Sequence, residues 1–323
     1  MCAIFGWLDY KGIVNSKVLN KLTQSLANAA EERGTDAAGI SYVYNKRITI
    51  YKRPRPAHKI KFKVPQGTKA VMGHTRFATQ GAKELNYNNH PFKGVADVPF
   101  ALAHNGVLYN DSTLKKTHKL PATGIDTDSY VAVQLIENYG TLNMYTLRTV
   151  AEEVKGTFNF TILDVYNNLY IVKGSNPITI LHYEALGLYI YASTDTIIEK
   201  ALKKSILLNF ACKKVKALEG DIIKIDRDGE VTKSKFTPKN FTKFDYYCNL
   251  YDWYDETEDS QESDEYELLY DYARMNGIDD YIVDELLEYG YSPLDVEELI
   301  YNTEQLDVVL KYIRGDFNDY ARI

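Results

Sequence analysis

The first residues of the chain contain a candidate nucleophile. Cys2 follows Met1, and aminopeptidases remove an initiator methionine when the next side chain is small, so we expect Cys2 to begin the mature chain. Its α-amine, with a solution pKa of about 7.7–8.0, can take the thiol proton and return it to a leaving group. One residue then supplies both nucleophile and base. Taken alone, Cys2 also fits an ordinary buried thiol, so this interpretation depends on the rest of the chain.

A second group of reactive side chains lies in residues 73–81, Gly-His-Thr-Arg-Phe-Ala-Thr-Gln-Gly, which continue an apolar strand into a loop. Arg76 is a natural bidentate partner for a carboxylate, and Thr79 can bond the same group. His74 has the chemistry of a base or a metal ligand. A structural role is favoured for it, because no second histidine or carboxylate lies at ligand spacing.

Two further segments each allow a structural and a functional interpretation. Asn105-Gly106 is typical of a hairpin turn, but an asparagine side-chain amide beside a glycine N–H can also form an oxyanion hole. Asp126 and Asp128 precede a predicted helix over 131–138, where either can serve as the N-cap. A carboxylate in that loop can instead bind an ammonium group. The residues alone leave both alternatives open.

The elements that must position these groups follow from hydrophobic spacing. The run after Cys2 predicts a short buried strand, and residues 16–30 have helical spacing that ends near Arg33-Gly34. Further strands are predicted at 42–44, 48–51, 156–164, 168–173 and 188–193, with a helix at 194–203 and a closing hairpin at 218–229. Residues 46–63 are rich in Lys and Arg. Without interleaved aromatics they favour a solvated loop over a nucleic-acid patch.

Composition limits the class of protein. The 323 residues are 45% hydrophobic and 25% charged, which is typical of a soluble globular protein. No apolar run approaches the roughly 20 residues that span a bilayer, and the features of a signal peptide are missing, so neither a membrane nor export is expected. Cys2, Cys212 and Cys248 lie far apart, which predicts neither a metal site nor a disulfide framework. The expected compartment is the cytoplasm, and no cofactor is expected.

The charges divide the chain into two parts. From Asp252 onward there are 22 acidic and four basic residues, whereas the first 251 residues contain 34 basic and 22 acidic ones. We therefore expect a basic body over 1–240, an acidic linker over 241–265 and a small acidic helical region over 266–323. Helical spacing in that region covers 266–275, 279–289, 292–302 and 306–313. The acidic region is expected to be a solvated appendage or to dock a basic surface.

The motifs, taken together and in order, resemble a known family. Residues 2–6, 33–40, 73–81, 89–91, 104–106 and 127–129 resemble the glutaminase domain of class II glutamine amidotransferases, the N-terminal-nucleophile hydrolases known from glucosamine-6-phosphate synthases. The resemblance covers about residues 2–230. It implies an α+β fold, a four-layer α/β/β/α sandwich with two mainly antiparallel sheets between helices.

The resemblance also implies an activity and a site. L-Glutamine would be hydrolysed to L-glutamate and ammonia through a Cys2 thioester, with Asn105 and Gly106 stabilising the oxyanion. The family's substrate-binding positions correspond here to Arg76, Phe77, Thr79, Gln80 and Asp128, and its supporting positions to Arg33, Gly34 and His74. Arg76 and Thr79 would hold the substrate carboxylate and Asp128 its ammonium group. Phe77 stands where the family usually has Trp, and Gln80 where it usually has His.

The resemblance leaves one leading interpretation of function and two alternatives. Past residue 240 about 80 residues remain, too few for the synthase domain that normally consumes the ammonia, so a free-standing glutaminase with a separate ammonia-accepting synthase is expected. A different amidohydrolase with an N-terminal cysteine is the first alternative. A non-catalytic regulatory or binding protein on the same fold is the second, and a retained Met1 would favour it.

Overall fold

A computed structural model of the chain divides it into two compact units, residues 1–239 and residues 240–323. The structure describes residues 2–78, 80–238, 269–270, 273–274, 276–291, 295–296, 299–300 and 303–314. Met1, Thr79, Cys248 and the predicted linker 241–265 therefore lie outside the described residues. Each unit is described by itself.

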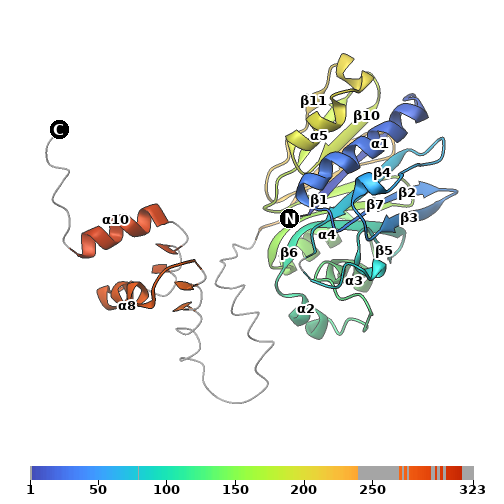
Figure 1. Cartoon of the computed structure of the whole chain (residues 1–323). Coiled ribbons are helices and arrows are strands. Elements are labelled where there is room, and N and C mark those ends of the chain that lie inside the picture. The colour runs from blue at the N-terminus through green and yellow to red at the C-terminus, as the bar shows by residue number, and fades with distance from the viewer. Residues whose placement is uncertain are drawn as a thin grey trace. The chain divides into compact units, whose positions relative to one another are not determined.

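The first unit contains two antiparallel sheets (Figure 1). The first sheet has the strand order β11-β9-β10-β1-β4-β2-β3 and is formed by β1 (Ala3–Asp9), β2 (Ala37–Tyr44), β3 (Arg47–Arg53), β4 (Ala70–Arg76), β9 (Thr179–Tyr183), β10 (Leu188–Ala192) and β11 (Lys213–Lys214). The strand β1 pairs with β4 on one side and with β10 on the other. Cys2 thus lies at the start of the central strand.

The second sheet has the order β13-β12-β8-β7-β6-β5. It is formed by β5 (Phe92–Val95), β6 (Pro99–Leu108), β7 (Gly156–Asp164), β8 (Leu169–Lys173), β12 (Asp221–Ile225) and β13 (Val231–Lys235). The strands β6 and β7 pair along their whole length, from Phe100 opposite Asp164 to Leu108 opposite Gly156. This long pairing fixes the position of Asn105 within the sheet.

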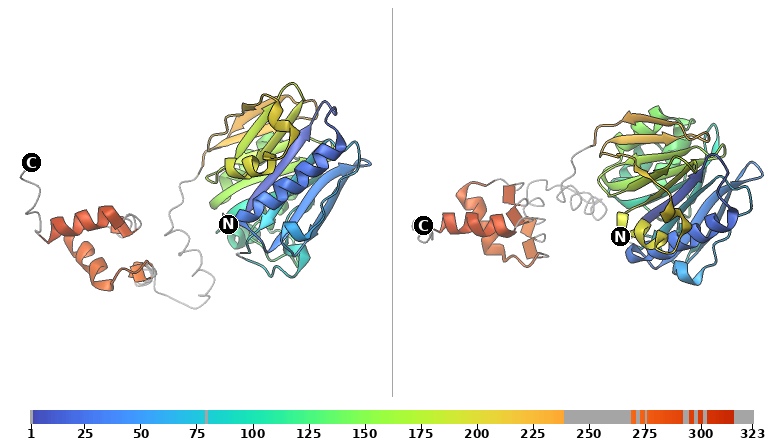
Figure 2. Two further views of the ribbon diagram at one scale, coloured as in Figure 1. Left: turned by 45° about the horizontal axis from the view of Figure 1, so that its top comes forward. Right: turned by 90° about the horizontal axis from the view of Figure 1, so that it is seen from above.

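Helices cover the outer face of each sheet, as Figures 1 and 2 show for the first sheet. The helices α1 (Ser16–Ala30) and α5 (Asp195–Leu202) pack on the first sheet, and α3 (Tyr130–Tyr139) and α4 (Met144–Glu153) on the second. A third apolar cluster fills the space between the sheets. The four-layer α/β/β/α prediction is therefore confirmed. The other helical segments are α2 (Asp111–Thr117) and the short turns Glu31–Arg33, Ala57–Lys59, Asn86–Asn88 and Ile206–Asn209.

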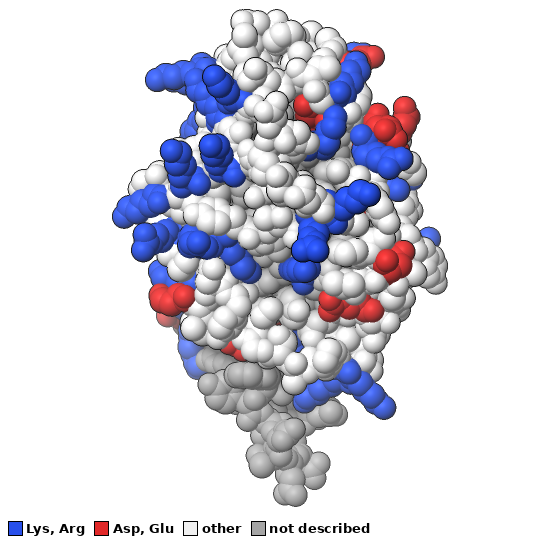
Figure 3. Space-filling view, turned by 90° about the vertical axis from the view of Figure 1, so that its right-hand side faces the viewer, with Lys and Arg blue, Asp and Glu red and all other residues white. Residues whose placement is uncertain are grey.

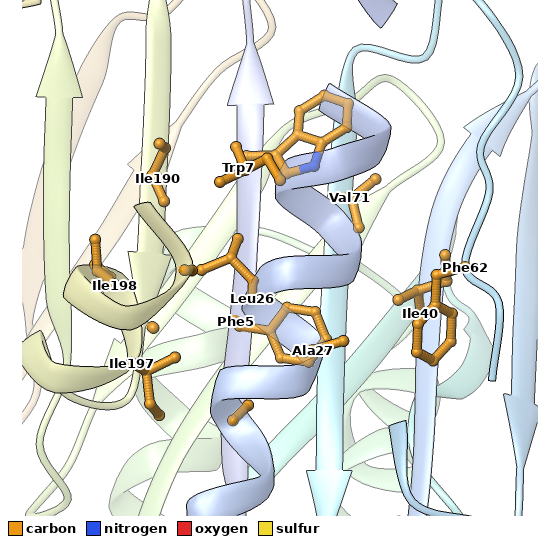
Figure 4. Close-up of a cluster of buried hydrophobic side chains, with 14 of the residues drawn as sticks. Phe5, Trp7, Leu26, Ala27, Ile40, Phe62, Val71, Ile190, Ile197 and Ile198 are labelled. Atoms are coloured by element: carbon orange, nitrogen blue, oxygen red, sulfur yellow. The ribbon is translucent and has the colours of Figure 1, made fainter. Parts of the chain in front are cut away.

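The strand β1 is buried on both faces, which explains its unbroken apolar run. Phe5 and Trp7 pack under α1 (Figure 4). Ile4 and Leu8 belong to the cluster between the sheets. The Trp7 indole also donates a hydrogen bond of 2.8 Å to Thr23 of α1. Each such side chain contributes about 1.5–3 kcal/mol on full burial. The strand that carries Cys2 is thus held firmly in the sheet.

The basic stretch 46–63 differs from the predicted solvated loop. Most of its first half is the edge strand β3, and farther on Ala57, Ile60 and Phe62 are buried against α1 while the lysines between them are exposed. The side of the unit where β2 and β3 lie in Figure 1 carries mainly Lys and Arg among its charged side chains (Figure 3). Positive charge along an edge strand discourages pairing with another sheet.

The second unit contains α8 (Asp280–Tyr289) and α10 (Thr303–Ile313). The predicted helix over 279–289 is confirmed, with Gly290 in the left-handed conformation that ends a helix. Among its described residues, nine buried side chains form an apolar core: Leu269, Ala273, Val283, Leu286, Val296, Leu299, Ile300, Leu306 and Leu310. The predicted helices 266–275 and 292–302 fall partly outside the described residues. In the part of the chain that the structure describes, no helix is both long and apolar enough to cross a membrane.

Candidate active site

The Cys2 thiol lies against the main chain of Phe77, just beyond the end of β4. Its Sγ is 3.4 Å from the Phe77 nitrogen, which donates to it, and 3.5 Å from the Phe77 carbonyl oxygen. Arg33 donates from Nε to the Cys2 carbonyl at 2.9 Å. Neighbours from two loops therefore fix both the backbone and the side chain of this residue.

The electrostatic surroundings of Cys2 favour a neutral resting thiol. Burial raises the pKa of the Cys2 thiol, and the Phe77 N–H and the Arg76 guanidinium partly offset that rise, while the Asp128 carboxylate adds to it. Arg76 and Asp128 are thus close enough to act on the charge of the sulfur. Because the thiol is neutral at rest, nucleophilic attack requires a local base.

The loop after α1 supports the loop that contacts Cys2. Asp36 accepts hydrogen bonds from Ala78 N at 2.9 Å and from Lys83 Nζ at 2.7 Å. Although burial alone would raise the pKa of Asp36, these two bonds lower it. Gly34 lies directly under the backbone of Arg76 and Phe77. The two loops therefore form one unit around the thiol.

We expect Gly34→Ala to disturb this unit. The added Cβ would lie 2.5 Å from the Arg76 carbonyl carbon and 2.7 Å from the Phe77 nitrogen, so backbone must move. The free energy of unfolding should fall by about 1–3 kcal/mol, and the alkylation rate of Cys2 by iodoacetamide should change. Gly124→Ala is the control, because nothing lies within 4 Å of its added Cβ. Equal melting temperatures for the two variants would contradict the expectation.

Arg76 is 3% exposed and organises the turn that follows it. It donates to Asn89 Oδ1 at 2.7 Å, to the Gly81 carbonyl at 2.9 Å and to the Gln80 carbonyl. Within the described part of the chain these bonds use three of the five guanidinium donors, which leaves two for an anionic ligand. The structure thus places a buried cation beside the thiol, held by neutral oxygens.

Asp128 binds the adjacent strand instead of capping a helix. Its Oδ2 accepts from Leu108 N at 2.6 Å, and Ser129 donates to Oδ1 at 3.3 Å. The helix α3 has Ser129 at its N-cap and no side-chain cap hydrogen bond there. The capping interpretation of Asp128 is therefore wrong. The carboxylate is 3% exposed and is near enough to influence both Cys2 and Arg76.

Asn105 and Gly106 lie inside β6, so the hairpin-turn interpretation is also wrong. Gly106 has φ of +145°, and a Cβ there would lie 1.8 Å from the Thr157 carbonyl oxygen. Only glycine satisfies both constraints. The Asn105 side chain points its Nδ2 at Ser193 Oγ, 3.3 Å away, and the same oxygen accepts from Ile4 N at 2.9 Å. Asn105 is thereby connected to the strand that carries Cys2.

The remaining predicted residues are placed as follows. Phe77 has its side chain 52% exposed, and Gln80 is exposed and contributes its carbonyl oxygen to Arg76. His74 lies behind the site, where its Nε2 is 2.9 Å from the His104 carbonyl oxygen. Thr79 lies outside the described residues. Among the described residues, no group of three His, Cys, Asp or Glu side chains is arranged to hold a metal ion.

Comparison with known proteins shows similarity in sequence and in fold. No protein-family model matches the chain. A curated relative named glutamine–fructose-6-phosphate aminotransferase (isomerizing), from Geobacillus kaustophilus, is 29% identical over 188 residues, which cover 56% of this chain and 30% of the relative. A relative of the same name from Bacillus cereus is 28% identical over 242 residues, covering 69% and 38%. The chain thus spans about a third of the length of these relatives.

Solved structures show the same fold. A glutamine phosphoribosylpyrophosphate amidotransferase from B. subtilis, complexed with ADP and GMP, aligns with a TM-score of 0.56 at 21% identity, covering 74% of this chain and 50% of that one. The first unit is thus similar in sequence to these aminotransferases and shares its fold with these amidotransferases. A structure described as the allosteric regulatory enzyme of purine biosynthesis aligns with a TM-score of 0.57 at 20% identity, with the same coverage.

The first unit also contains a buried group of three histidines, His74, His90 and His104, beside the site. His74 and His90 have ring centroids 4.2 Å apart, and His104 donates to or accepts from Ser129 Oγ at 2.7 Å. Burial lowers the pKa of all three, that of His74 to about 3. We infer that they are neutral and structural near pH 7.

These histidines give the first unit a predictable response to acid. An unfolded histidine has a pKa of about 6.5, so below that pH the unfolded chain binds protons that the folded chain does not. The free energy of unfolding should therefore fall as the pH drops from 6.5 toward 3, by up to about 1.4 kcal/mol per pH unit for each group. Urea unfolding at pH 7.0 and 5.0 measures this slope. His74→Asn should flatten the slope, because it removes one of the three buried rings; an unchanged slope in this variant contradicts the account.

Two residues to which the sequence assigned no role complete the site. Ser193, which with Ala192 weakly resembles a segment of the family, binds both Ile4 and Asn105. Asn176 donates to the Asn105 carbonyl at 2.8 Å, although 71 positions separate the two. The contacts of Ser193 and Asn176 with Asn105 cannot be predicted from local sequence spacing, because they join residues that are far apart in the sequence.

Proposed function

We propose that the chain hydrolyses the side-chain amide of L-glutamine, with Cys2 as the nucleophile and its own α-amine as the base. The observation that carries this proposal is the position of the Cys2 thiol. It lies beside a buried guanidinium and a buried carboxylate, and its strand is joined to the Asn105 amide through Ser193. Glutamine has one carboxylate for the guanidinium, one ammonium group for the protein carboxylate, and one amide for the thiol.

The reaction has two halves in this proposal. The Cys2 amine takes the thiol proton, the sulfur attacks the amide carbon, and the oxyanion accepts hydrogen bonds from Asn105 Nδ2 and Gly106 N–H. The carbon–nitrogen bond then breaks, and the amine returns the proton to the departing ammonia. This leaves a γ-glutamyl thioester on Cys2. Water, deprotonated by the same amine, attacks the thioester and releases glutamate and the thiol.

Substrate recognition follows from the two buried charges. Arg76 has donors left for the α-carboxylate, with Thr79 as a second donor, and Asp128 accepts from the α-ammonium group. Binding at both ends holds the amide near the sulfur and lowers the entropic barrier. Phe77 and Gln80 lie on the loop above the site and complete the binding surface.

The proposed activity is tested by ammonia release from purified protein. L-Glutamine should be hydrolysed, while asparagine, whose side chain is one methylene shorter, and a glutamine analogue that lacks the α-carboxylate should be hydrolysed at least tenfold more slowly. Equal rates of hydrolysis for all of these amides would favour the alternative that the chain is an amidohydrolase acting on a different amide. If no amide is turned over, the non-catalytic alternative holds.

We also propose that the ammonia is used by a separate synthase, in a reducing cytoplasm that keeps Cys2 a thiol. The related proteins are named as aminotransferases, and this supports a biosynthetic use of the amide nitrogen. The acidic region from Asp252 onward is proposed to dock a basic surface, because it has 22 acidic and four basic residues. Association that persists, with the same salt dependence, after neutralising Asp255, Glu256, Glu258 and Asp259 would contradict the docking proposal.

A further inference from the structure

Ser193 is a buried hydroxyl at a junction of three strands. It follows β10 directly, it has no exposed surface, and its Oγ lies 2.9 Å from Ile4 N, 3.4 Å from Ile4 O and 3.3 Å from Asn105 Nδ2. Ile4 belongs to the strand that begins beside Cys2, and Asn105 belongs to the other sheet. One oxygen thus connects the nucleophile strand to the amide assigned to the oxyanion hole.

The hydrogen bonds of this hydroxyl determine which side of the Asn105 amide, Nδ2 or Oδ1, faces Ser193. A serine hydroxyl has one donor and two acceptor positions. The Ile4 N–H occupies one acceptor, and the hydroxyl proton is directed to the Ile4 carbonyl. With the proton placed there, the remaining lone pair accepts from the Asn105 NH₂ group 3.3 Å away. A flipped amide would require the hydroxyl to give up its bond to the Ile4 carbonyl and donate to Oδ1 instead.

The backbone of Asn105 is fixed independently. The Asn176 side chain donates to the Asn105 carbonyl at 2.8 Å. The Asn159 side chain in turn donates to the carbonyl oxygens of Asn176, at 2.7 Å, and Pro177, at 3.1 Å, and so holds the loop that contains Asn176. With the backbone held, the remaining freedom of Asn105 lies in its side chain. Ser193 removes that freedom by binding one of the two amide hydrogens.

We propose that Ser193 is a positioning residue that sets the amide orientation of Asn105 and leaves its second N–H for the oxyanion. This inference rests on the proposed function, because it assigns Ser193 a role in amide hydrolysis. Hydrogen-bond donors stabilise a transition state best when they are fixed in advance. The role of Ser193 is therefore visible in turnover more than in substrate binding.

Ser193→Ala in the full chain tests the proposal. Turnover of glutamine should fall about 10- to 100-fold, less than on loss of the donor itself, with KM within about threefold. Alkylation of Cys2 by iodoacetamide, followed on the N-terminal peptide, should stay within about twofold, because that reaction forms no oxyanion. Ser193→Thr retains the hydroxyl and should recover part of the rate. Ser41→Ala is the control, since Ser41 is equally buried in the same sheet and its Oγ has no partner among the described residues.

A double-mutant cycle gives the sharpest result. In an Asn105→Ala background, Ser193→Ala should change turnover less than about twofold, because the group on which it acts is gone. Additive losses, full activity of Ser193→Ala, or a parallel loss of alkylation would each overturn the role of Ser193 while leaving glutamine hydrolysis intact. A wild-type chain that releases no ammonia would overturn the proposed function and this inference with it.

Discussion

Replacing Cys2 with alanine is expected to lower the rate of ammonia release from glutamine by about 10⁴-fold or more. The variant keeps the α-amine, the two buried charges and the oxyanion donors, so it should still bind glutamine with similar affinity. What it loses is the atom that forms the covalent bond to the amide carbon. Turnover is measured by coupled ammonia assay, and binding by calorimetry.

Two controls separate this loss from general damage. Cys212→Ala removes an exposed free thiol and should leave turnover unchanged. A chain that keeps Met1 retains the Cys2 sulfur but lacks its free amine, and should also lose most of its turnover. Hydrolysis that survives in Cys2→Ala would show that the nucleophile lies elsewhere.

Asn105→Ala is expected to reduce turnover by about 10²–10³-fold, with KM changed by no more than a few fold. The residue is 1% exposed, and its Nδ2 already contacts the strand of Cys2 through Ser193. The donated hydrogen bond matters most when negative charge develops on the substrate oxygen. The loss should therefore appear in turnover, measured at saturating glutamine.

Asn143→Ala is the matched control for Asn105→Ala. Asn143 caps α4 by accepting from Thr146 N at 2.9 Å, so its loss should cost about 1 kcal/mol of stability and leave turnover unchanged. A large KM increase in Asn105→Ala with normal turnover would assign Asn105 to substrate binding and would remove it from the oxyanion hole.

Elements with strong local patterns were predictable from the sequence. The strand β7 has the predicted bounds, 156–164, because apolar residues run through it between a glycine and an aspartate. The helix α1 covers the predicted span 16–30 and is capped by Asn15. Its expected end near Arg33-Gly34 is wrong, because a 3₁₀ turn, Glu31–Arg33, follows Ala30 and Gly34 is extended instead of left-handed. The helix α4 has no counterpart among the predicted elements, since its buried apolar positions Leu147, Val150 and Ala151 are few.

The site was only partly predictable, because its residues meet through long-range contacts. From its position in the sequence Asp128 resembled a helix cap. In the structure its Oδ2 instead accepts a hydrogen bond from Leu108 N, 20 residues away in the sequence. Asn105-Gly106 resembled a turn, although pairing with β7 extends the strand through both residues. Motif resemblance identified these positions, but the link through Ser193 depends on the stacking of two sheets.

The central claim is that Cys2, with its amine free, forms a covalent bond to the γ-carbonyl of glutamine. The most direct measurement mixes purified chain with glutamine, quenches with acid within one turnover, and examines the N-terminal peptide by mass spectrometry. We predict a peptide that begins at Cys2 and carries a γ-glutamyl group, absent from the Cys2→Ala variant. A peptide that begins at Met1, or one that stays unmodified while ammonia is released, would contradict the account.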